Sequence, residues 1–293
     1  MGSPIAHPAT AAVTAAATQS GTPGDVQIKP RNRSHDITAA LQGEWLDNNA
    51  FLTAFFNGMS IAFPVGEKFF IDSVRHYAEQ VTDPVLKENI KGFCGQEGFH
   101  RREHQRYNET LCAARGYDLE KLEGTLTRRL NWAQENLPPI TNLAITVAIE
   151  HFTGVLAELL LSPASIMDRA EPSMRALWRW HAAEEMEHKA VAFDVYRAVG
   201  GSEELRLGVM RRVSVLMSVE LTRALFYILK KDGQLFNLKL WRTGLAGLFG
   251  KHGAFSGGWA PYKAFYTRGF HPWQQDTREL LVQWAAEPQL LST

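Results

Sequence analysis

Two Glu-x-x-His runs form the clearest chemical pattern in this sequence. The first extends from Glu97 to His100 and the second from Glu185 to His188. Residues three positions apart lie on the same face of a helix, so each run projects a carboxylate and an imidazole in one direction. A single run occurs by chance in many helices and is then ordinary surface charge. Two runs, each within a long helical segment, favour a shared chemical site.

A lone glutamate lies upstream of each run, on the helix expected to precede it. Glu150 stands in the apolar stretch 146–152, where a buried carboxylate needs a partner. Glu67 is less distinctive, because its flanking Gly and Lys also suit an exposed first turn, and Glu79 is a nearby competitor. The repeated order of Glu followed by Glu-x-x-His indicates an internal duplication of a two-helix unit.

Four carboxylates and two imidazoles in this order are typical of a two-metal site inside a four-helix bundle. Isolated buried carboxylates are very costly, and four negative charges balance two divalent cations. Mixed oxygen and nitrogen ligands with open positions suit iron first, with manganese or zinc as alternatives. The predicted metal ligands are Glu67, Glu97, His100, Glu150, Glu185 and His188.

Two further histidines could extend this ligand set. His181 lies four positions before Glu185 and seven before His188, so the three share a helix face and His181 is an expected additional ligand. His104 lies four positions after His100 and could mirror that role on the other helix. Either residue could instead be an ordinary core or surface histidine.

The elements that must position these residues read as helices. Asp83-Pro84 is typical of a helix start and Gly116 of a helix end. No segment shows the alternation between turn signals that marks a strand. The sequence therefore predicts an all-α fold with a four-helix bundle and additional N- and C-terminal helices. The four helices expected to carry the ligands cover residues 64–80, 84–115, 140–161 and 171–199.

Composition divides the chain into a tail and one domain. Residues 1–35 are rich in Ala, Thr, Pro and Gly without a sustained apolar run, so they are expected to form a disordered tail. Residues 36–293 show no composition break and are expected to form a single helical domain. Within it, the metal-binding bundle would cover about residues 64–199 and a helical extension residues 203–293.

Charge and cysteine content limit the partners and the location. The 31 basic and 31 acidic side chains give a formal net charge of zero, which argues against nucleic-acid binding. Cys94 and Cys112 would lie about 27 Å apart on one helix and could not form a disulfide, which favours a reduced, cytoplasmic location. The apolar segment 209–229 carries charged side chains, so no transmembrane segment is expected there. The sequence does not decide whether the chain forms a homodimer.

Gln96 and Glu184 stand directly before the glutamates of the two runs. The extended pattern resembles the ferritin-like diiron carboxylate superfamily, which includes ferritins, the ribonucleotide reductase small subunit and bacterial multicomponent monooxygenases. There, an aspartate at this position hydrogen-bonds the opposite ligand histidine. The resemblance implies that Glu184 orients His100 and that Gln96 orients His188. Because Gln96 is uncharged, it also implies that the two metals are not equivalent.

Two narrower resemblances point in different directions. The run His181-x-x-x-Glu185-x-x-His188 resembles the arylamine N-oxygenase branch, where a third histidine joins the metal ligands. Over roughly residues 40–290 the chain also resembles a bacterial family of predicted metal-dependent hydrolases, and this strengthens Glu67 as a ligand. The segments that carry the second resemblance, besides the two runs, are Phe63-Pro64-x-Gly66-Glu67-x-Phe69-Phe70 and Gly269-Phe270-His271-Pro272-Trp273.

Three functions are compatible with such a site. The leading expectation is an oxidoreductase: a diiron oxygenase that activates dioxygen, receives electrons from a donor and oxidises a small apolar substrate. The alternative is a two-metal hydrolase, in which the cations lower the pKa of a bound water and hold a small-molecule ester or phosphate in place. The third is a non-catalytic ferritin-like metal-binding protein. No Ser-His-Asp arrangement or nucleophile elbow supports a metal-free hydrolase.

Overall fold

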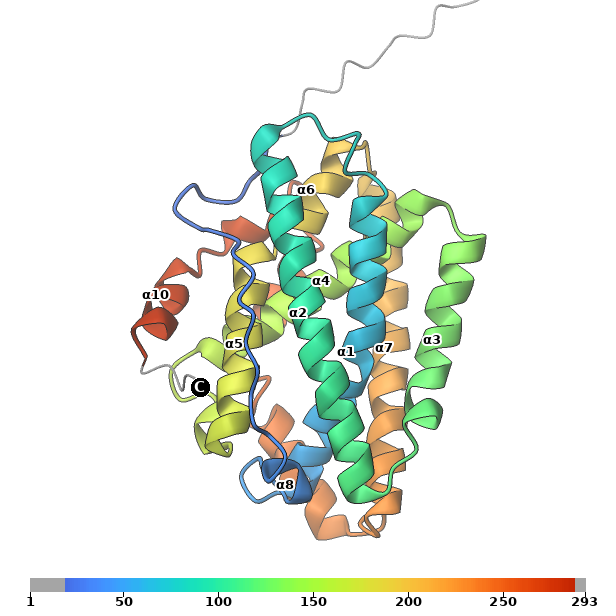
Figure 1. The fold of residues 1–293 in the computed structure, drawn as a ribbon, viewed down its shortest axis with the longest axis vertical. Coiled ribbons are helices and arrows are strands. Elements are labelled where there is room, and N and C mark those ends of the chain that lie inside the picture. The colour runs from blue at the N-terminus through green and yellow to red at the C-terminus, as the bar shows by residue number, and fades with distance from the viewer. Residues whose placement is uncertain (1–18, 288–293) are drawn as a thin grey trace, which may run out of the picture.

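Four long helices form the centre of the molecule (Figure 1). The computed structural model describes residues 19–287, and within this range the only extended pairing is one isolated β-bridge. The predicted all-α fold is therefore confirmed. Helix α1 packs most extensively on α2, and α4 on α5. The four helices are α1 (Ala50–Arg75), α2 (Pro84–Arg115), α4 (Pro139–Leu161) and α5 (Pro172–His188).

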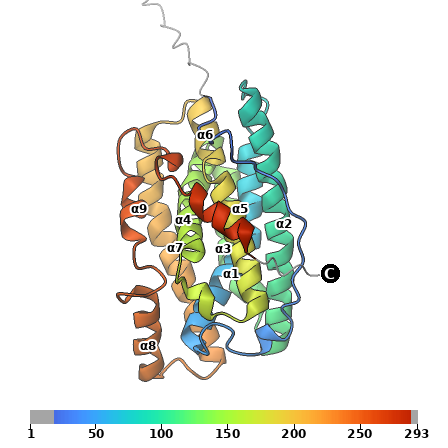
Figure 2. The ribbon, with the colours of Figure 1, turned by 90° about the vertical axis from the view of Figure 1, so that its left-hand side faces the viewer.

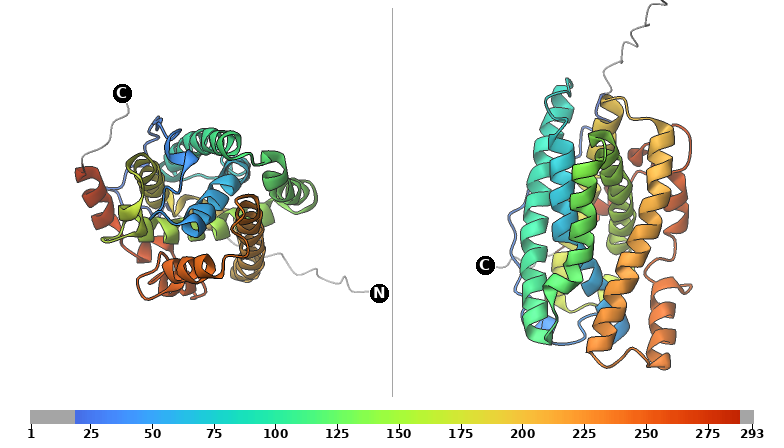
Figure 3. Two further views of the ribbon diagram at one scale, coloured as in Figure 1. Left: turned by 90° about the horizontal axis from the view of Figure 1, so that it is seen from below. Right: turned by 90° about the vertical axis from the view of Figure 1, so that its right-hand side faces the viewer.

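The remaining helices surround this centre. Helix α3 (Leu119–Asn136) packs mainly on α1 and stands at the periphery when the bundle is viewed from below (Figure 3). Helix α7 (Glu203–Lys231) packs against both α1 and α4. Helices α8 and α9 follow one another along one edge, and α10 lies beside α5 (Figure 2). The shorter helices are α6 (Val191–Ala198), α8 (Leu238–Phe249), α9 (Trp259–Ala264) and α10 (Arg278–Ala286).

Helix α1 differs from the sequence prediction, which begins a helix at Pro64. In the structure Pro64 lies inside α1. A proline cannot donate to the carbonyl four residues earlier, so the Ser60 carbonyl lacks its helical partner. The Asn108 side chain of α2 fills this role, because its Nδ2 donates to Ser60 O at 3.0 Å. A contact between helices therefore replaces the missing bond within the helix.

The helix predicted over residues 171–199 is also divided in two. Helix α5 ends at His188, and α6 begins at Val191. Between them, the Lys189 ammonium donates hydrogen bonds to Gln275 O and Thr277 Oγ1. The break thus ties the C-terminal part of the chain to the helix end beside His188.

Apolar side chains form two separate core clusters. On α1 the first cluster ends near Ile61 and the second begins at Phe69. On α2 and α4 the two clusters also meet on either side of Glu97 and Glu150. The apolar side chains of α5 all belong to the first cluster, and the second cluster resumes beyond His188, in α6. The chemistry-bearing residues therefore lie in one layer between two apolar regions.

Residues 19–35 do not behave as the predicted disordered tail. They form an extended segment that follows α2 and α5 (Figure 1). The segment passes so close to α2 that a side chain at Gly92 would collide with Ile28, and one at Gly95 with Pro30. Average composition hides these specific contacts, which explains the difference. The rest of the predicted tail lies outside the described residues.

Within residues 19–287, α4 alone is long and apolar enough to cross a membrane by length and composition. Its mean hydropathy is 1.6 over an 18-residue window, of which 56% is buried against the rest of the protein. The buried side chains include Glu150.

Replacing Asn108 by Leu should lower the free energy of unfolding by about 1–3 kcal/mol, because the Ser60 carbonyl would be buried without a donor. Pro64→Ala restores a backbone donor for that carbonyl. The same Asn108→Leu change should therefore cost less in a Pro64→Ala background. Urea unfolding of the four proteins in this double-mutant cycle measures the coupling, and strictly additive effects would contradict the explanation.

Candidate metal centre

The four central helices each place one glutamate in the layer between the apolar clusters. Their relative exposures are 2% for Glu67, 0% for Glu97, 2% for Glu150 and 3% for Glu185. Such complete burial of four carboxylates requires neutralisation by protons, by cationic side chains or by metal ions.

The carboxylates converge with imidazoles into two groups. His188 Nε2 lies 3.2 Å from Glu97 Oε1, 3.4 Å from Glu185 Oε2 and 3.6 Å from Glu150 Oε2. In each group, one ligand atom of every member lies within 4.8 Å of the others. The first group consists of Glu97, Glu150, Glu185 and His188, and the second of Glu67, His100 and His181.

Many polar atoms of this layer have no hydrogen-bond partner among the described residues. Both carboxylate oxygens of Glu67, Glu97 and Glu150 are in this state. So are His100 Nδ1 and His188 Nε2. Buried polar atoms are normally satisfied, and metal coordination satisfies oxygen and nitrogen atoms that converge in this way. The residues present therefore fit divalent cations.

The pKa values reflect the same crowding. Burial raises the pKa of Glu97 to about 7 despite its contact with His188. Burial, reinforced by neighbouring carboxylates, also raises the pKa values of Glu67 and Glu150. Burial opposes ionisation of Glu185, but the adjacent imidazoles outweigh it and hold its pKa well below the usual range. Likewise, burial would lower the pKa of His188, yet contacts with Glu185 and Glu97 raise it.

Each of the two candidate ligand histidines is oriented by a side chain of the opposite run. His100 Nε2 lies 3.0 Å from Glu184 Oε2, and His188 Nδ1 lies 2.9 Å from Gln96 Oε1. These are the two pairs that the superfamily resemblance implies. In each imidazole the second nitrogen faces the carboxylates, which is the arrangement that a metal-binding histidine needs.

Two residues missed by the sequence analysis complete this outer network. Arg31 Nη1 donates to Glu184 Oε1 at 3.1 Å and to Glu187 Oε2 at 2.8 Å. Gln96 Nε2 donates to the same Glu187 oxygen at 2.6 Å. Arg31 therefore supports the partners of both ligand histidines. Glu187 is visible as a third glutamate in the second run, but Arg31 lies in the segment predicted to be disordered.

His181 and His104 occupy different positions. His181 Nε2 contacts Glu185 Oε1 at 2.9 Å, and its Nδ1 lies 2.7 Å from His104 Nε2. His104 Nδ1 in turn contacts Ser60 Oγ at 2.9 Å. Both nitrogens of His104 are thus engaged outside the layer, and His104 joins neither group of candidate ligands. His181 therefore lies among the candidate ligands, and His104 lies on the far side of His181 from them.

Arg31→Met should weaken metal binding about ten- to a hundredfold, the usual effect of removing an outer partner of a ligand histidine. Competition with a chromophoric chelator measures the affinity. Arg278→Met is the matched control, because Arg278 Nη1 also holds the N-terminal segment through Asp25 at 3.1 Å, yet its side chain is 42% exposed and lies away from the ligand layer. Equal metal affinity in both variants would contradict a role for Arg31 at the centre.

In the metal-free protein, the free energy of unfolding should fall between about pH 6.5 and 8. The raised pKa values of Glu67, Glu150 and His188 mean that the folded state retains protons that the unfolded chain has released. Each such proton costs about 1.4 kcal/mol per pH unit. Bound cations displace these protons and should remove the decline. Urea unfolding of both forms tests this, and a metal-free protein whose stability rises with pH would refute it.

Comparison with known proteins decides the family. A family model described as predicted metal-dependent hydrolase matches residues 29–276, a range that includes Arg31. No curated protein and no solved structure matches the chain. The match supports the hydrolase alternative, so the leading expectation of a diiron oxygenase with dioxygen and an electron donor is wrong. Glutamate and histidine bind redox-active and purely Lewis-acidic cations alike, which is why the ligand pattern misled. The chain belongs to the predicted metal-dependent hydrolase family.

Proposed function

We propose that this chain is a two-metal hydrolase of small-molecule esters. The observation that carries the proposal is the convergence of buried carboxylate and imidazole atoms that lack hydrogen-bond partners. Four carboxylates would balance two divalent cations, and the ligands would project inward from four helices, as in ferritin-like bundles. The carboxylate-rich set suits manganese or iron better than zinc. The proposed ligands are Glu67, Glu97, His100, Glu150, Glu185, His188 and His181.

The cations would supply a water of lowered pKa and would polarise the substrate carbonyl. The contribution of the chain is to hold the ligands in the required state. Glu184 accepts a hydrogen bond from His100, so the Nδ1 lone pair of His100 points inward. Gln96 does the same for His188 through its amide oxygen, which leaves Nε2 as the inward atom. Arg31 balances the charge of the outer carboxylates.

The surroundings favour a neutral ester over a phosphate. Aromatic rings cover the histidines: the ring centroids of Phe93 and His188 are 4.9 Å apart, and those of Trp180 and His100 are 5.0 Å apart. Phe63 lies equally close to His181, at 4.9 Å. These rings limit water around the centre. An anionic phosphate would add charge to a site that already contains four carboxylates, whereas an ester would not.

Glu97→Ala and Glu185→Ala variants should lose most of their bound metal and their metal-dependent hydrolysis of 4-nitrophenyl acetate. Each change removes a carboxylate from the centre of the layer. Elemental analysis of protein purified without chelator gives the metal content, and the turnover is measured after loading with manganese, iron or zinc. Glu88→Ala is the matched control, because Glu88 lies on α2 with its side chain 75% exposed.

Two outcomes would overturn this proposal. If both variants retain full metal content, the ligands are wrongly assigned. If the loaded wild-type protein binds metal but hydrolyses neither 4-nitrophenyl acetate nor 4-nitrophenyl phosphate faster than the metal-free protein, the hydrolytic function is wrong.

A further inference from the structure

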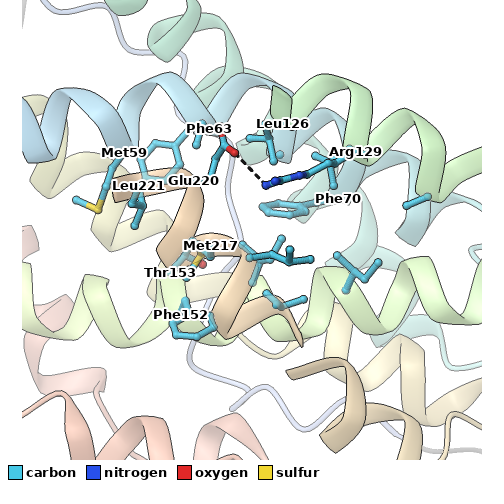
Figure 4. A pocket seen from close by; sticks show the side chains of 18 of the residues that line it. Met59, Phe63, Phe70, Leu126, Arg129, Phe152, Thr153, Met217, Glu220 and Leu221 are labelled. Atoms are coloured by element: carbon cyan, nitrogen blue, oxygen red, sulfur yellow. Dashed lines mark hydrogen bonds and ion pairs between the residues drawn. The ribbon is translucent and has the colours of Figure 1, made fainter. Parts of the chain in front are cut away.

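A cavity of about 760 Å³ lies between α1, α3, α4 and α7 (Figure 4). This volume falls within the range of about 300–1,000 Å³ that is typical of small-molecule sites. The lining is dominated by apolar side chains from all four helices. They include Met59, Phe70, Leu126, Phe152, Met217 and Leu221.

The cavity opens to solvent between α3 and α7. Trp132 of α3 and Leu216 of α7 both line it, and they are 57% and 49% exposed. Large apolar side chains at an opening bind apolar ligands more readily than they bind water. An apolar ligand of low water solubility could therefore enter the cavity at this point without crossing a charged interior.

The few charged groups of the lining are neutralised or face outward. The buried Glu220 carboxylate accepts hydrogen bonds from Arg129 Nη1 at 3.1 Å and from Arg223 Nε at 2.8 Å (Figure 4 shows the first pair). Arg128, the other cation of the lining, is exposed. The ligand segment that fits inside must therefore be uncharged and apolar.

The inner wall of the cavity separates it from the candidate metal centre by a single layer of side chains. Phe63 and Thr153 line the cavity and also border a small void whose other side is formed by His181 and Glu185. Thr153 Oγ1 further donates to Glu150 O at 3.1 Å. A group that reaches past this wall would stand beside the ligands.

We propose that the cavity binds the acyl chain of an uncharged carboxylic ester, with the ester group at the Phe63 and Thr153 wall. This inference rests on the proposed hydrolytic function. In the reaction, a bond forms between the water oxygen and the acyl carbon while the bond from that carbon to the alkoxy oxygen breaks. The departing alkoxide takes up one proton of the attacking water and the other proton is released, so the products are a fatty carboxylate and an alcohol.

The test is a series of 4-nitrophenyl esters with increasing acyl length. Burial of each methylene is worth about 0.8 kcal/mol, so kcat/KM of the metal-loaded protein should rise about fourfold per methylene from butanoate to octanoate. Met217→Trp fills the cavity and should lower the octanoate-to-acetate ratio of kcat/KM at least tenfold. Val215→Trp, on the outer face of the same helix at 63% exposure, should leave the ratio unchanged.

A binding measurement separates the two proposals. Calorimetric titration with 1-decanol should show binding to the wild-type and Val215→Trp proteins, and binding should be lost in Met217→Trp. Leu126→Trp, from the α3 side of the cavity, provides the same test if Met217→Trp does not fold. If no ester of any length is hydrolysed but decanol binds in this pattern, the hydrolytic function fails and the apolar site stands. If acetate is hydrolysed without any dependence on chain length, the acyl-chain proposal is overturned.

Discussion

The burial of four carboxylates in one layer is the constraint on which the rest of this structure depends. Ionised carboxylates at this depth repel one another and have lost their water, so they require cations or protons. The layer is held at one level because α1, α2 and α4 each pack into an apolar cluster on either side of it, and α5 packs into the first of these clusters. Sliding α1, α2 or α4 by one turn would move its glutamate into an apolar cluster. The two-part core therefore fixes the height of the ligands as well as the stability of the bundle.

The outer hydrogen-bond network places a negative charge near both His100 and His188, although only His100 is paired directly with a carboxylate. Glu184 is a carboxylate and accepts directly from His100. Gln96 is neutral, but its amide nitrogen donates to the Glu187 carboxylate, so a negative charge stands one hydrogen bond further from His188. Arg31 pairs with both carboxylates. The Arg31 guanidinium thus neutralises the carboxylates that support both histidines. The extended segment that carries Arg31 is therefore part of the candidate metal centre.

The ligand set and the surrounding cavity constrain the function in different ways. Glutamate and histidine define where cations bind, but they do not distinguish a redox-active cation from a Lewis acid. The family match supports hydrolysis over redox chemistry. As the proposed acyl-chain site, the apolar cavity beside Phe63 and Thr153 would limit the substrate, since its interior offers apolar surface and paired charge. Under the proposed function, chemistry and specificity would therefore reside in adjacent but separate parts of the bundle.

The sequence by itself determined the all-α fold, the bounds of α2 and the residues that converge, because helix periodicity and capping signals are local. It also paired Glu184 with His100 and Gln96 with His188 through resemblance. Only the tertiary structure decided what depends on contacts between distant segments. These are the continuation of α1 through Pro64, the position of His104 behind His181, and the approach of Arg31 to the centre. Such contacts have no periodic signature, since they arise only when the helices pack together.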